Sequence, residues 1–285
     1  MPRLHYTVSL AYEVQDAAAR VILNIEAART AHQAIVRESL TLPPGVQVDR
    51  HTDPVLANRW LRVHAPPGPL TIQYEAVVDV NAHEADPLTL SEPFVGDLPF
   101  EVLPYLAPSR YAESDRLRAS AWREFGALAP GYGRVMAVRA WVQQHLQYVS
   151  QSSVETTSAT DSIITRVGVC RDFANLMAAL CRALNLPARF TTSLDYGKDP
   201  ALGPSDFHAV VEVFLSGRWY LFDPSGVALP TGLLRIGTGR DASDIPFASL
   251  FGAVVPVSPP AITVVALAED GHAWPAATSL ALSTA

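Results

Sequence analysis

Apolar and polar residues alternate through several stretches of the first 80 residues, with the period of two that a half-buried β-strand shows. The alternation is clear over residues 6–12, 21–25 and 70–78, and two Pro-Pro-Gly sequences mark turns between them. This pattern predicts an all-β, sandwich-like domain over residues 1–80. Sheet modules of this kind most often serve as scaffolds, and the pattern alone assigns no chemistry to this one.

A proline-rich connector follows, and the pattern then changes. Residues 81–108 carry prolines at positions 87, 93, 99, 104 and 108, so we expect an extended segment packed on the surface. Helical spacing of apolar residues begins after it, over residues 114–126, 133–148 and 170–184. Short strands and loops complete the chain, and residues 109–285 are therefore predicted to form a core domain with C-terminal strands.

The charge and composition of the chain limit the classes of partner that it can have. A net charge of −7 argues against a nucleic-acid partner, which would need a basic face. No run of about 18 apolar residues occurs, so no membrane span is predicted. The first 16 residues read as a strand and lack the apolar core and cleavage site of a signal peptide. With two cysteines and no export signal we expect a cytoplasmic location, and nothing in the sequence sets an oligomeric state.

Cys170 opens a predicted helix and is the first candidate for chemistry. The free backbone N–H groups and the dipole at a helix start favour a thiolate, and the same groups can bind a developing oxyanion. The polar loop of residues 149–160 comes just before the cysteine, where loops often form one wall of a site. The common alternative for a cysteine is a buried structural role. We interpret Cys181 in that way, because it lies in the middle of the helix among Ala, Leu and Met.

A predicted hairpin brings His208 and Asp223 together. Its strands are residues 208–215 and 218–222. If Ser216-Gly217 is a two-residue loop, the aspartate lies diagonal to the histidine on the same face, and if the loop begins one residue earlier they are directly opposite. A three-residue loop without a bulge would place them on opposite faces, so the pairing depends on an even loop. Taken alone, a histidine at a strand start is usually an ordinary half-exposed residue.

The order Cys170, His208, Asp223 offers the thiol, imidazole and carboxylate of an activated nucleophile. No other histidine pairs with a histidine or cysteine at a ligand spacing, so no metal site is predicted. Neither the phosphate-binding pattern G-x-x-x-x-G-K-[ST] nor the dinucleotide pattern G-x-G-x-x-G occurs. We therefore expect no cofactor.

At these residues the chain resembles the transglutaminase-like superfamily. The matching pieces are residues 168–174 around the cysteine, His208-Ala209 ahead of a strand, and residues 219–224 around the aspartate. Residues 157–161 and the sequence Gly-Arg-Asp-Ala-Ser-Asp at 239–244 resemble one group within it, the bacterial transglutaminase-like cysteine proteases that carry a β-domain before the core.

The resemblance covers roughly residues 130–255 and implies both a fold and a set of roles. The implied class is α+β, with an N-terminal β-sandwich-like domain followed by a papain-like, transglutaminase-like core. The implied roles are nucleophile for Cys170, base for His208 and orienting carboxylate for Asp223, and all three positions are filled.

The residues around the cysteine have weaker assignments. A second oxyanion donor is needed beside the cysteine N–H, and Tyr148 is the first candidate, with Gln147 and Gln151 as alternatives. A core role suits Tyr148 equally well. Arg171 and Asp172 are interpreted as a structural pair at the helix start, because surface pairs contribute little.

We therefore expect an enzyme that transfers an acyl group from a peptide or glutamine-type amide through a thioester, with hydrolysis favoured over cross-linking. Its expected partner is a peptide or protein substrate. One alternative is a peptide-binding module that keeps the fold without turnover. Another is an interaction protein whose β-domain recruits a partner through an exposed apolar patch.

Overall fold

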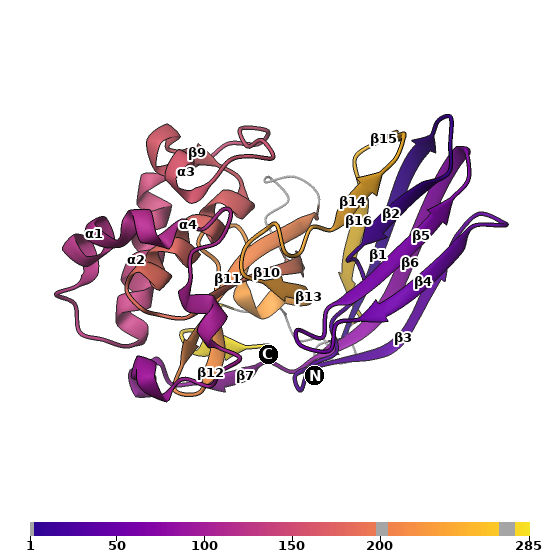
Figure 1. The fold of residues 1–285 in the computed structure, drawn as a ribbon. Coiled ribbons are helices and arrows are strands. Elements are labelled where there is room, and N and C mark those ends of the chain that lie inside the picture. Colours follow the sequence, from indigo (N-terminus) through magenta and orange to yellow (C-terminus); the bar gives the residue numbers. More distant parts are fainter. Residues whose placement is uncertain (1–2, 198–204, 268–276) are drawn as a thin grey trace.

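The computed structural model describes residues 3–197, 205–267 and 277–285, which form two adjoining lobes (Figure 1). One lobe is built of β-strands, and the other packs helices against one face of a four-stranded sheet. The α+β class expected from the resemblance is confirmed.

The first sheet of the β lobe is built on a long strand with alternating burial. The sheet consists of β15 (Val254–Pro256), β1 (Arg3–Val14), β6 (Gly68–Val80) and β3 (Gln33–Thr41) in that order, with β16 (Ala261–Ala266) also paired to β1. Every second side chain of β1 is buried, which is the period of two that the sequence shows.

A second sheet covers the buried face of the first. It consists of β14 (Ala248–Phe251), β2 (Ala19–Leu23), β5 (Arg59–Ala65) and β4 (Gln47–Thr52) in that order. The inner faces of the two sheets share one apolar core, to which Tyr6, Val21, Leu61 and Ile72 belong. Two packed sheets with a common core form the expected sandwich.

Strands β14, β15 and β16 come from the C-terminal part of the chain but belong to the β lobe. The sequence-based boundary placed residues 109–285 in the core domain, whereas residues 248–266 pair with β1 and β2. Ile262 and Val264 are buried in the sandwich while their neighbours on β16 are exposed. The alternation of a short strand shows which face is buried, but not which sheet edge the strand will join.

The connector between the lobes contains short turns where an extended segment was expected. It includes β7 (His83–Ala85), which pairs with β17 (Ala281–Ser283), and the 3-10 helices η1 (Pro87–Thr89), η2 (Val95–Asp97) and η3 (Leu103–Leu106). Leu98 and Val102 are buried against Phe214 of the core. Because proline fixes φ near −65°, it suits the first turn of a 3-10 helix as well as an extended segment.

The central element of the other lobe is α4 (Cys170–Ala183). Three helices pack around it, α1 (Ser114–Phe125), α2 (Tyr132–His145) and α3 (Ala159–Thr165). Its remaining side faces a sheet of β12 (Arg218–Phe222), β11 (Phe207–Leu215), β10 (Ala188–Asp195) and β13 (Leu233–Gly239), in that order. Smaller elements are β8 (Gln147–Tyr148), which pairs with β9 (Val167–Gly168), and η5 (Pro230–Gly232).

The burial and the ends of α4 follow from its sequence. From Asp172 to Ala183 every residue is buried, because helices cover one side and the sheet the other. At its start, the Asp172 carboxylate accepts a hydrogen bond from the Val169 N–H at 2.9 Å. After its end, Asn185 adopts a left-handed φ of 63°, and Pro187 cannot continue the helix. Cys170 is thereby held at the first position of the helix, where it packs against the edge of the core and stays partly exposed.

Candidate active site

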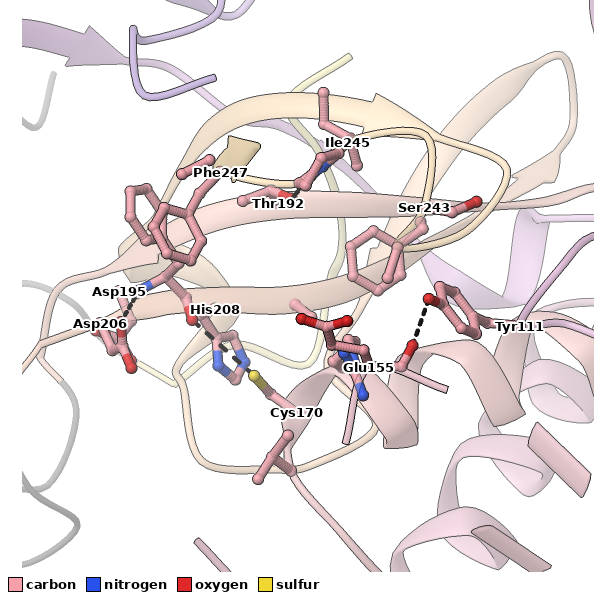
Figure 2. A pocket seen from close by; sticks show the side chains of 18 of the residues that line it. Tyr111, Glu155, Cys170, Thr192, Asp195, Asp206, His208, Ser243, Ile245 and Phe247 are labelled. Carbon is pink, nitrogen blue, oxygen red and sulfur yellow. Dashed lines mark hydrogen bonds between the residues drawn. The ribbon is translucent and has the colours of Figure 1, made fainter. Parts of the chain in front are cut away.

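A cavity of about 800 Å³ lies between the two lobes, beside the start of α4 (Figure 2). It is lined by the first residues of α4, the adjoining ends of β10 and β11, and residues from the segments 148–155 and 242–248. Cys170 and His208 both line it, and Figure 2 shows the cysteine sulfur pointing toward the histidine ring.

The two cysteines differ as their positions in the helix predict. Cys170 is partly exposed, and its Sγ lies 4.0 Å from the Phe207 carbonyl oxygen at the start of β11. Cys181 lies near the other end of the same helix and is fully buried. Burial raises the pKa of its thiol to about 12. The buried structural role inferred for Cys181 is confirmed, and Cys170 is the thiol that small molecules can reach.

The hairpin of β11 and β12 has the even loop on which the His–Asp pairing depended. Leu215 pairs with Arg218, so the loop is Ser216-Gly217. Both loop residues have positive φ, 45° and 80°, as a tight two-residue hairpin loop requires. Asp223 directly follows β12 and lies on the same side as His208, with the His208 Nε2 atom 3.3 Å from Asp223 Oδ2. The contact is an ion pair without the alignment of a full hydrogen bond.

Asp223 is buried and its carboxylate is held by the turn that follows it. Oδ1 accepts hydrogen bonds from the N–H and hydroxyl of Ser225 at 2.9 and 2.7 Å, and Oδ2 accepts from the Ala228 N–H at 2.9 Å. Burial alone would raise the pKa of Asp223, but the charge of His208 and these donors lower it to about 2. The carboxylate is therefore ionised at neutral pH.

His208 is also buried, and its environment favours the charged ring. Burial alone would lower the pKa of His208, whereas Asp223 and, to a smaller extent, the Cys170 thiol raise it well above its ordinary value. Because Nε2 faces Asp223, Nδ1 is the nitrogen left for the thiol. A charged imidazole beside a thiol is an arrangement that can activate a cysteine.

Tyr148, the first candidate for a second oxyanion donor, lies on β8 and lines the cavity. Partial burial and the charges of Cys170 and Asp206 raise the pKa of Tyr148 to about 12. Its hydroxyl is therefore protonated at neutral pH and able to donate. Of the two alternatives, Gln151 also lines the cavity and has a left-handed φ of 64°, whereas Gln147 is not among the described lining residues.

Arg171 and Asp172 tie the polar loop to the start of α4. Asp172 is buried and accepts a hydrogen bond from the Ser153 hydroxyl at 2.8 Å. Arg171 donates to the same hydroxyl and to the Val154 carbonyl, both at 2.5 Å. The pair is more buried than a surface pair, and its contacts position the loop over the cavity.

Several lining residues gave no signal in the sequence. Asp195 and Asp206 flank the segment that joins β10 to β11, and Phe207 stacks on Phe247 at 4.8 Å between ring centroids. Tyr111 reaches the cavity from a segment ahead of α1. Each comes close to Cys170 only through folding, so no local spacing could reveal it.

No helix in the described ranges is both long and apolar enough to cross a membrane. In the same part of the chain, no three histidine, cysteine, aspartate or glutamate side chains are grouped so that they could hold a metal ion.

Comparison with known proteins agrees with this architecture. The family model "Transglutaminase-like superfamily" matches residues 121–224, and the model "Bacterial transglutaminase, N-terminal domain" matches residues 3–92. A crystal structure described as a "Putative Cysteine Protease" from Cytophaga hutchinsonii superposes with a TM-score of 0.91 at 33% identity, over 99% of this chain and 97% of that one. The chain belongs to the transglutaminase-like superfamily.

The curated relatives of this superfamily member match it over only part of either chain. An uncharacterized protein of Mycobacterium leprae is 28% identical over 116 residues, which are 39% of this chain and 41% of that protein. An uncharacterized protein of Mycobacterium tuberculosis is 34% identical over 110 residues, 35% of each chain. The match therefore spans less than half the length of these relatives.

Proposed function

We propose that this protein is a thiol-dependent enzyme that cleaves a peptide or glutamine-type amide through Cys170, His208 and Asp223. The observation that carries the proposal is the placement of these groups. A partly exposed thiol at a helix start lines a cavity of about 800 Å³ beside a buried histidine, whose Nε2 is 3.3 Å from a buried, ionised carboxylate. Buried charged groups at the wall of a cavity more often have a catalytic role than a purely structural one.

The reaction begins with transfer of the Cys170 proton to His208. The thiolate attacks the carbonyl carbon, a C–S bond forms, and the carbonyl electrons move to oxygen. The Cys170 N–H and the Tyr148 hydroxyl stabilise that oxyanion. His208 then returns the proton to the amide nitrogen, the C–N bond breaks, and an amine leaves a thioester on Cys170. Asp223 keeps the imidazole oriented and stabilises its charged form.

A second substrate completes the cycle. Water adds to the thioester, His208 accepts its proton, and the thiolate leaves with release of a carboxylic acid. An amine in place of water would give an acyl transferase. Hydrolysis is favoured because Cys170 is partly exposed in an open cavity, where water reaches the thioester. The Cytophaga hutchinsonii protein, which is 33% identical, is described as a "Putative Cysteine Protease", and this description supports the same choice.

The test uses casein in two assays. Release of peptides from fluorescein-labelled casein reports hydrolysis, and incorporation of monodansylcadaverine into dimethylated casein reports amine transfer. The Cys170→Ala variant is the control in both. We expect peptide release that depends on Cys170. Equal release by Cys170→Ala would refute the proposal. Amine incorporation without peptide release would make the enzyme a transferase.

A further inference from the structure

A buried carboxylate outside the triad joins two distant segments of the cavity wall. Asp241 belongs to the Gly-Arg-Asp-Ala-Ser-Asp sequence at 239–244 and is fully buried. Its Oδ2 accepts a hydrogen bond from the Tyr111 N–H at 2.8 Å. Its Oδ1 accepts from the N–H and the hydroxyl of Ser243 at 2.8 and 2.6 Å. Donors from both segments on one buried carboxylate hold them in a single arrangement.

Both residues that Asp241 holds line the cavity. Tyr111 and Ser243 are lining residues, and in Figure 2 they lie on the other side of the Cys170 sulfur from Asp206. Asp241 itself is not a lining residue, so its effect on a substrate must pass through them.

Tyr111 also contacts the polar loop of residues 149–160. Its hydroxyl donates to the Glu155 carbonyl oxygen at 2.5 Å, and its ring lies 5.7 Å from the Arg171 guanidinium. This loop follows Tyr148, the candidate oxyanion donor. A shift of the Tyr111 backbone would therefore move the wall that stands nearest to the start of α4.

Residues 241–248 form a strap that closes the cavity on the side of the β lobe. Ile245 and Phe247 of this strap line the cavity, and Phe247 stacks on Phe207 with an angle of 15° between the rings. The far end is fixed by the sandwich, because the Asn24 N–H donates to the Phe247 carbonyl at 3.0 Å. Asp241 is thus the anchor of the strap at the end near the core.

We propose that Asp241 is a positioning residue that holds the strap and Tyr111 as the wall on which a substrate peptide rests an apolar side chain. The proposal builds on the proposed function. Because Ile245, Phe247 and Phe207 present an apolar surface to the cavity, a large apolar or aromatic side chain beside the scissile amide fits it best. Asp241 makes no contact with the reacting atoms and leaves the reactivity of Cys170 unchanged.

The variant Asp241→Asn removes the anchor with little change in volume. One carboxylate oxygen becomes an amide NH2, which must then face a backbone N–H of either Tyr111 or Ser243. Two donors in contact cannot bond, so that segment moves away. Asp244→Asn is the matched control. It lies in the same strap, but neither it nor its partner Arg240 lines the cavity, and its side chain is partly exposed.

The experiment compares two reagents for the Cys170 thiol. Iodoacetamide is small and reports the reactivity of the sulfur alone. Benzyloxycarbonyl-Phe-Ala-chloromethyl ketone carries an aromatic side chain and a peptide backbone. In its reaction the sulfur displaces chloride and forms a thioether. The constants KI and kinact for the ketone and the rate constant for iodoacetamide are measured on the full chain. Mass spectrometry separates labelling of Cys170 from that of Cys181.

For Asp241→Asn we expect KI to rise by about 10-fold, because a small displacement of binding groups weakens positioning. The kinact value and the iodoacetamide rate should stay within about 2-fold of those of the unchanged protein, since the thiol and its partners are untouched. Asp244→Asn should leave all three constants unchanged.

A general loss of stability would lower the melting temperature and would change KI and kinact together. If Asp241→Asn does not fold, Ser243→Ala removes one donor and keeps the carboxylate, and a smaller rise in KI is expected. An unchanged KI in the folded variants, or a ketone that never saturates the unchanged protein, overturns the inference. A failure of the proposed function looks different, because peptide release from casein by Cys170→Ala would then equal that of the unchanged protein.

Discussion

The substitution Asp223→Asn isolates the charge that stands beside His208. The Nε2 and Oδ2 atoms are 3.3 Å apart, and the aspartate is almost fully buried, so solvent screens the pair little. An asparagine has nearly the same shape but no charge. It therefore removes the attraction that favours the imidazolium while the hairpin stays in place.

The magnitude follows from the distance. With an effective dielectric constant of about 20, two unit charges at 3.3 Å attract by about 5 kcal/mol. If the reactive state needs the charged imidazole, losing this term slows the reaction by about 10³- to 10⁴-fold, since each 1.4 kcal/mol is about one factor of ten. The amide NH2 would also face a backbone N–H that now donates a hydrogen bond to Asp223, either that of Ser225 or that of Ala228. Two facing donors would cost about 1–3 kcal/mol in folding stability.

The assay measures labelling of Cys170 by iodoacetamide from pH 5 to pH 9, together with urea unfolding. Ser225→Ala is the matched control. It removes one hydrogen bond to Asp223, at 2.7 Å, but leaves the charge beside His208. We expect its labelling profile to match that of the unchanged protein within a few-fold, since one hydrogen bond is worth about 1 kcal/mol.

A folded Asp223→Asn protein that labels at the unchanged rate at every pH would refute the reasoning. It would show that the thiolate does not depend on the carboxylate, and that Cys170 and His208 act as a pair without it. Urea unfolding separates a loss of labelling in the folded protein from a loss of folding.

Three further predictions concern the cysteines and pH. Cys170 should be alkylated far faster than Cys181 near neutral pH, because Cys181 is buried with its pKa raised to about 12, and mass spectrometry of each site checks this. Cys170→Ala should keep the melting temperature within a few degrees, since Ala suits a helix and the position is partly exposed; circular dichroism decides, and loss of folding would mean that Cys170 is a core residue. The pair Asp223–His208 should stabilise the fold most between about pH 4 and pH 6.5. The depressed pKa of Asp223 means that its contribution, about 2 kcal/mol, is present above its ordinary value of 3.8 and lost as pH falls toward 2. The raised pKa of His208 means that its contribution is present below the ordinary value and lost as pH rises through the folded one. Urea unfolding of the unchanged protein and Asp223→Asn across pH 3–9 tests this, and a stability difference that is constant over the range would contradict it.

Local patterns predicted the parts of the site that depend on local geometry. The helix start at Cys170 follows from apolar spacing and a preceding glycine, and the hairpin register follows from Ser216-Gly217. The contact between His208 and Asp223 could therefore be inferred, because one tight turn decides it.

Contacts between distant segments could not be inferred in this way. Tyr111 meets Asp241, 130 positions away, through a backbone N–H that any residue except proline could supply. The acidic residues at 195 and 206 reach the cavity only because β10 and β11 pair. Likewise, strand β16 alternates like any half-buried strand, and its partner β1 is chosen by the shape of the finished sandwich.

The return of β15 and β16 to the first strand sets an order of events in folding. The edge of β1 that they cover remains open until residues 254–266 have left the ribosome, so the β lobe cannot be completed before the helical lobe has been synthesised. A cut near residue 108 would leave one fragment with an uncovered edge and the other with strands that have no partner, and both are prone to aggregate. Pairing across such a separation also slows folding, because a long loop must close before the contact forms. The two lobes are thus one unit for expression and for any attempt to exchange parts with relatives.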